Sequence, residues 1–132
     1  MTDFEKAVIH LQTSGDEDWE MAERLFKSKD YAYSLFFCHL ALEKFLKAAV
    51  VVKTNAPAPY THFLARLAEM AELPINESQI ASLKTITRFN ISGRYDNEKR
   101  TFRKLATKEY AQEYFNITQG LILWLKNNYL KK

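Results

Sequence analysis

Three side chains that can carry a proton or a charge recur at four-residue spacing: His39, Glu43 and Lys47. On a helix such positions lie one above another, so the three form a polar ridge. One interpretation is structural: Glu43 and Lys47 form an ion pair, worth about 0.3–0.5 kcal/mol on a surface, and His39 is a satisfied border residue. The other is that the ridge belongs to a ligand site.

Basic side chains are concentrated between residues 84 and 108, where eight Lys and Arg stand against two acids, while the whole chain carries a formal net charge of +3. Such a segment is typical of a surface that binds a polyanion or an acidic partner, and a solvated loop is the plain alternative. Within it, Arg94 offers a guanidinium for phosphate and Tyr95 a ring for stacking on a base. The structural alternative pairs Arg94 with Glu43 or a nearby acid and packs Tyr95 on the fold.

Other chemistry finds little support in the sequence. One Cys and three scattered His give no paired spacing of the zinc type, and three glycines cannot build a phosphate-binding loop. Cys38 lies among apolar residues and is expected to pack as a small hydrophobe. We therefore expect no metal and no cofactor.

The elements that must position these residues are helices. The chain has 132 residues, 47% of them apolar, and only 3 Gly and 3 Pro, which disfavours a turn-rich β fold.

A turn over Thr13–Asp16 is expected to precede the first helix, and the segment 92–104 is expected to be a polar, basic connection. Asp30, Thr61 and Thr107 are expected helix caps. The expected helices cover residues 16–29, 31–53, 62–71, 80–91 and 108 onward. The prediction is an all-α, up-and-down antiparallel bundle of four to five helices in a single domain, residues 1–132, with its core at about 15–130.

The second expected helix is apolar nearly all round, apart from the polar ridge. Such a helix is buried on more than one side. The bundle can cover one side, and a second copy of the chain can cover the side that bears Phe36 and Leu40. A homodimer is therefore expected.

Neither the start of the chain nor its apolar stretch suggests a membrane or secretion. Residues 1–12 carry acids and no apolar run, and residues 31–52 are interrupted by His39, Glu43, Lys44 and Lys47. A chain with a single cysteine cannot form an internal disulfide, so an oxidising compartment would not stabilise it. We expect no membrane span and a cytoplasmic location.

Three motifs together resemble one family. The run FCHLALEKFLKA at residues 37–48, PYTHFL at 59–64 and GRYD at 93–96 is similar to the HEPN domain, whose name stands for higher eukaryotes and prokaryotes nucleotide-binding. The resemblance covers about residues 15–130. It implies a helical bundle, commonly dimeric, often encoded beside or fused to a minimal nucleotidyltransferase in toxin–antitoxin modules.

Other HEPN members are metal-independent ribonucleases, in which an Arg is followed after four to six residues by a His at the dimer cleft. Here no His follows Arg88 or Arg94, so no imidazole at that spacing can move a proton. A ribonuclease with a divergent site remains the alternative, and it would need His39 or His62 to meet Arg94 across the fold. A purely structural interaction domain is the third possibility.

The sequence therefore predicts a non-catalytic HEPN module that binds nucleotide or RNA weakly. Lys47 and Arg94 are the expected phosphate ligands, with Tyr95 beside them. Glu43 is expected to orient a base rather than touch phosphate, because two anions repel, and His39 and His62 are the remaining candidate site residues. His62 alternatively serves only as a residue at a helix N-terminus.

Overall fold

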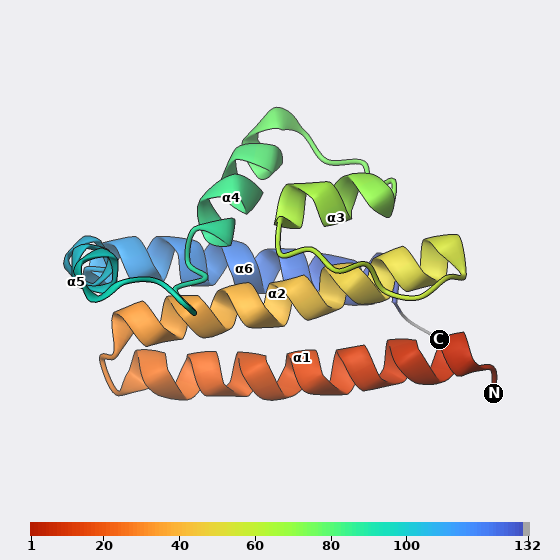
Figure 1. Cartoon of the computed structure of the whole chain (residues 1–132), viewed down its shortest axis with the longest axis horizontal. Helices are drawn as coiled ribbons and strands as arrows, with labels where there is room; N and C mark the ends of the chain where they lie inside the picture. The colour runs from red at the N-terminus through yellow and green to blue at the C-terminus, as the bar shows by residue number, and fades with distance from the viewer. Residues whose placement is uncertain (131–132) are drawn as a thin grey trace.

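The computed structural model describes residues 1–130, and over that range it contains six helices and no strand (Figure 1). The helices are α1 (Asp3–Lys27), α2 (Tyr31–Thr54), α3 (Leu64–Met70), α4 (Glu77–Thr87), α5 (Asp96–Leu105) and α6 (Lys108–Asn128). The helical bundle predicted from the sequence is confirmed. None of the helices in this range is long and apolar enough to cross a membrane.

The three long helices form the body of the molecule, and the three short ones complete it. α1 and α2 make an antiparallel hairpin, and α6 runs along α2 (Figure 1). α3 and α4 lie on the side of α2 away from α1, and α5 lies across one end of the bundle. The segments before α3 and before α5 therefore both approach α2.

α2 is the central helix, as its all-round apolar sequence predicts. Fourteen of its 24 residues are buried, and it packs against α1, α3, α4, α5 and α6. Phe36 and Leu40, the residues expected to face a second copy, are only partly buried. Self-association through them stays a prediction.

The predicted turn over Thr13–Asp16 is wrong, because α1 runs through it without interruption. The helix begins instead at a capping box in which Thr2 and Glu5 bond each other's backbone N–H. Gly15 is buried on α1, and a Cβ built there would lie 2.9 Å from Cε2 of Phe45. The glycine permits a close approach between α1 and α2 and does not mark a turn.

The predicted polar connection over residues 92–104 is also wrong, because α5 occupies most of it. Glu98 Oε1 accepts a hydrogen bond from the backbone N–H of Tyr95, 3.2 Å away, at the start of α5. Phe102 is the one buried residue of this helix. A helix that buries a single side chain has no apolar stripe, and the sequence pattern therefore missed it.

Two caps illustrate the difference between a correct and a displaced boundary. Thr107 Oγ1 accepts from the N–H of Tyr110 at 3.2 Å, so α6 begins as predicted. Thr61 Oγ1 accepts from the N–H of Phe63 at 3.2 Å, but α3 begins only at Leu64, with Phe63 as its N-cap. His62 therefore lies in the segment that precedes α3, not in the helix.

Candidate functional site

Glu43 is the centre of the polar ridge on α2. Its Oε2 lies 2.9 Å from Lys47 Nζ, and its Oε1 lies 3.4 Å from His39 Nε2. The ridge therefore contains the Glu43–Lys47 ion pair of the structural interpretation. The carboxylate is nonetheless almost completely buried, with 7% of the residue exposed, so it is not a surface pair.

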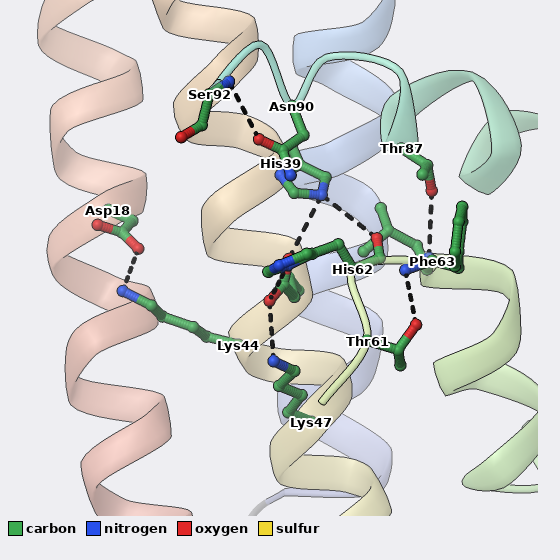
Figure 2. Close-up of polar contacts among 12 residues, drawn as sticks. Asp18, His39, Lys44, Lys47, Thr61, His62, Phe63, Thr87, Asn90 and Ser92 are labelled. Atoms are coloured by element: carbon green, nitrogen blue, oxygen red, sulfur yellow. Dashed lines mark hydrogen bonds and ion pairs between the residues drawn. The ribbon is translucent and has the colours of Figure 1, made fainter. Parts of the chain in front are cut away.

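His62 joins the ridge from the segment before α3. Its Nδ1 lies 2.9 Å from Oε1 and 3.0 Å from Oε2 of Glu43. In Figure 2 the ring of His62 turns toward α2, whereas the ring of Phe63 turns away from it. Because Nδ1 donates to a carboxylate, the other ring nitrogen, Nε2, is left facing outward from the pair, and the His62 side chain is 67% exposed.

The protonation states of the ridge follow from burial and from the neighbouring charges. Burial alone would raise the pKa of Glu43, but the hydrogen bonds from Lys47 and His62 and the charge of Lys47 outweigh it, so the pKa is lowered. Burial lowers the pKa of His39, and the attraction of Glu43 does not overcome it. The ridge thus holds an ionised Glu43 and a neutral His39.

His39 supports the ridge from inside the core. The residue is fully buried, and its Nε2 faces two acceptors, Glu43 Oε1 at 3.4 Å and the backbone oxygen of His62 at 3.5 Å. Two acceptors at one nitrogen place the proton there, so Nδ1 is a bare acceptor, and it has no partner within residues 1–130. His39 thereby holds both the carboxylate and the segment that carries His62.

A hollow of about 390 Å³ lies beside His62, and we name it the loop hollow. It is lined by Tyr60, Thr61, His62, Phe63, Thr87, Asn90 and Arg94. Thr87 links the start of α3 to α4 at this hollow. Its Oγ1 accepts a hydrogen bond from the N–H of Leu64 at 3.1 Å and donates one to the backbone oxygen of Leu83 at 2.8 Å. The fold therefore brings His62 and Arg94, which are 32 residues apart in the sequence, to one cavity.

The charges of Lys47 and Arg94 differ in what they contact. Lys47 is mostly buried and its charge is matched by Glu43, whereas Arg94 forms no ion pair with any acid in the part of the chain that the structure describes. The predicted alternative in which Arg94 pairs with Glu43 is thus not observed. Tyr95, the N-cap of α5, is 80% exposed.

Two aromatic residues of the loop hollow, Tyr60 and Phe63, were not among the site residues predicted from the sequence. Tyr60 is fully exposed and Phe63 is 67% exposed, which is unusual for side chains of that size. Both flank His62 in the run PYTHF. The signal that could have found them is the position of His62 between two aromatic residues, because aromatic side chains that stack on bases are typical of surfaces that bind single-stranded nucleic acid.

Comparison with known proteins identifies the fold family. The profile of the HEPN domain matches residues 10–128, which is most of the chain. The chain belongs to the HEPN domain family. A search of curated proteins found no match.

A solved structure supports the same architecture. The crystal structure of TT1696 from Thermus thermophilus superposes with a TM-score of 0.72 at 18% sequence identity, covering 91% of this chain and 96% of that chain. At that identity the likeness speaks for the fold alone. The solved structure thus supports the helical bundle, and the chemistry of the loop hollow depends on the residues that line it.

No candidate metal site accompanies the hollow. Among residues 1–130 there is no cluster of three or more His, Cys, Asp or Glu side chains that could hold an ion. Cys38 is buried, and burial raises its pKa to about 12. The chemistry that these residues offer is cationic and aromatic.

Proposed function

We propose that this HEPN domain is a binding module for RNA or nucleotide, and that the loop hollow is where it holds phosphate. The observation that carries the proposal is the pairing of two groups in one cavity. Arg94 has no acidic partner within residues 1–130, and His62 presents a free ring nitrogen beside it. A guanidinium and an imidazole in one hollow are suited to a phosphate oxygen.

Exposed aromatic rings near the hollow support the choice of RNA or nucleotide as the ligand. Tyr60 and Phe63 border the hollow, and Tyr95 directly follows Arg94. Rings that stand in solvent beside cations stack on bases of any sequence, at about 1–3 kcal/mol per base. The proposed ligand is therefore single-stranded RNA, or a nucleotide derived from it.

Glu43 is proposed as a positioning residue. It holds His62 through two short contacts and is itself buried, so it cannot approach a phosphate. Lys47, proposed from the sequence as a phosphate ligand, is better explained as the counterion of Glu43. Of the six residues proposed for the site, Arg94, Tyr95 and His62 face the ligand, and Glu43, His39 and Lys47 support His62.

The test is a titration of labelled single-stranded RNA and of ATP at two salt concentrations. Arg94→Ala is expected to weaken binding by about 1–3 kcal/mol, the range for a lost charge-assisted contact. Lys6→Ala is the matched control, because it removes an equal charge from an exposed position on α1. Equal affinities of the wild type and Arg94→Ala would overturn the proposal.

RNA cleavage is the second candidate function, and one observation favours it. A carboxylate that holds His Nδ1 leaves Nε2 free to take a proton, and Arg94 lines the same hollow. The Glu43–His62–Arg94 arrangement thus differs from the family's usual Arg-to-His spacing but offers the same two groups. Cleavage of labelled RNA that disappears in His62→Ala would select this function over binding alone.

Two partners are proposed from the family and from α2. A minimal nucleotidyltransferase is proposed on HEPN membership alone, and co-purification with such a protein encoded by a neighbouring gene would test it.

A second copy is proposed to cover Phe36 and Leu40. Leu40→Glu should then convert a dimer into a monomer in analytical ultracentrifugation, and a monomeric wild type would rule the dimer out. The proposed setting for both is the cytoplasm, which suits the buried Cys38.

A further inference from the structure

A second hollow shares Arg94 with the loop hollow. It measures about 340 Å³ and opens between α4 and α5, against the start of α6, and we name it the α4–α5 hollow. Its lining includes Arg88, Arg94, Asn97, Glu98, Phe102 and Tyr110. Arg94 therefore lines both hollows.

The size of the two hollows limits what each can hold. At about 340 and 390 Å³ both lie at the small end of the range for ligand pockets, about 300–1,000 Å³. Each is suited to one nucleotide rather than to a folded RNA. Two such hollows that share an arginine are suited to two successive nucleotides joined by one phosphate.

We propose that the two hollows are adjoining subsites for one RNA single strand, with Arg94 on the phosphate that joins two nucleotides. One base stacks on Phe63 or Tyr60 at the loop hollow, and the next base enters the α4–α5 hollow. This inference rests on the proposed binding function, and it adds the length and path of the ligand.

The chemistry of the α4–α5 hollow favours a base over a second phosphate. Glu98 carries a negative charge there and repels a phosphate, but its carboxylate and the Asn97 amide can hydrogen-bond to a base edge. Phe102, 6% exposed, provides an apolar floor. A flat ring with polar edges matches this lining.

Two further groups reach the ligand backbone. Arg88 lines the α4–α5 hollow and forms no ion pair within residues 1–130, so its guanidinium can donate hydrogen bonds to the sugar of the second nucleoside. Burial raises the pKa of Tyr110, with the neighbouring Tyr114 and Glu113 adding to the rise, although Arg88 opposes it. The Tyr110 hydroxyl therefore keeps its proton at neutral pH and can donate a hydrogen bond to a sugar or phosphate oxygen.

The test compares adenosine monophosphate with the dinucleotide ApA by NMR titration. Each carries one phosphate, but the monophosphate is a monoester with nearly two negative charges at neutral pH and ApA is a diester with one. A gain for ApA therefore comes from the second nucleoside and not from charge. We expect ApA to bind about tenfold more tightly than the monophosphate, and a tetranucleotide to add little more. Equal affinities for the monophosphate and ApA would overturn the inference.

Variants then locate the second nucleoside. Arg88→Ala and Thr101→Trp, which fills the α4–α5 hollow, should each reduce the ApA affinity about tenfold and leave thermal stability unchanged. Lys84→Ala is the matched control, since Lys84 lies on α4 and outside the hollow. If Arg94→Ala weakens binding while Arg88→Ala and Thr101→Trp do not, the two-subsite path is wrong and the binding function stands. If Arg94→Ala has no effect, both fail.

Discussion

α2 and α5 both place charged side chains near the site, but in opposite surroundings. On α2, Glu43 and its neighbours are largely buried and pair with one another, and Lys44 Nζ lies 2.6 Å from Asp18 Oδ2 on α1. On α5, Lys99, Arg100, Arg103 and Lys104 form no ion pair within residues 1–130, and Phe102 alone is buried.

Burial thus separates the charges that support the site from those that are free to meet a ligand. A buried charge must be paired, because removing it from water costs several kcal/mol. An exposed charge keeps its water and gains little from a neighbour, so evolution can place it for an external partner. The α2 ridge is thus the support of the site, and Arg94 with α5 is its binding face.

The strongest test of this difference between α2 and α5 is to remove the central carboxylate of α2. Glu43→Ala leaves Lys47 and the two histidines without their anion, so the free energy of unfolding should fall by about 3 kcal/mol. Glu98→Gln on α5 is the control, expected to change it by less than about 0.5 kcal/mol. Urea denaturation measures both. Equal effects would mean that the two helices do not differ as argued.

A second prediction contrasts two helical glycines, one buried against α2 and one exposed. Gly15→Ala adds a Cβ 2.9 Å from Phe45, and the overpacking should outweigh the gain in helix propensity, giving a net loss of about 1 kcal/mol. Gly120→Ala meets nothing within 4 Å and should stabilise α6 by about 0.5–1 kcal/mol. Thermal unfolding would show opposite shifts, and shifts of the same sign would refute the close approach.

The buried histidine predicts a dependence of stability on pH. The pKa of His39 is lower in the folded state than in the unfolded chain, where it is near 6.5. Below about pH 6.5 the unfolded chain therefore binds more protons than the folded chain. The free energy of unfolding should decrease as the pH is lowered, by up to about 1.4 kcal/mol per pH unit.

His39→Gln should remove most of this slope between pH 6.5 and 5. The contribution of Glu43, whose folded pKa is lowered, is lost only at more acidic pH, below its ordinary value of 4.5, so it does not mask the effect. His10→Gln is the control, because His10 is exposed on α1. A slope that survives in His39→Gln would assign it to another group.

The smallest effect belongs to α5. Arg100→Ala should change the free energy of unfolding by less than about 0.5 kcal/mol. Because the strand is proposed to occupy only the two hollows, the variant should also leave the salt dependence of RNA binding unchanged. Measuring affinity at several salt concentrations checks this, and a log–log slope lowered by about one unit would show that the strand continues along α5.

Local sequence patterns predicted what local forces decide. The Thr107 cap and the Glu43–Lys47 pair each join residues within four positions of one another, and both are present. The apolar character of α2 is likewise a property of one continuous segment, and the helix is central and largely buried. The family resemblance, carried by three motifs in order, is confirmed over residues 10–128.

What the patterns could not predict depends on contacts between distant segments. The Glu43–His62 contact spans 19 residues and joins a helix to a loop, for which no periodicity exists. The sharing of one hollow by His62 and Arg94 depends on how α3 and α4 pack on α2. α5 was missed because only Phe102 holds it to the core.

The contact between Gly15 and Phe45 also fixes the register of the α1–α2 hairpin. Sliding α1 by one turn, about 5.4 Å, would bring Leu11 or Trp19 opposite the Phe45 ring, and neither side chain would fit where a glycine now lies. Lys126 contacts the same ring, with its Nζ 5.1 Å from the centroid, so α6 is aligned by it as well. The Phe45 ring thus contacts both of the long helices that flank α2, and the small residue on α1 lets it do so.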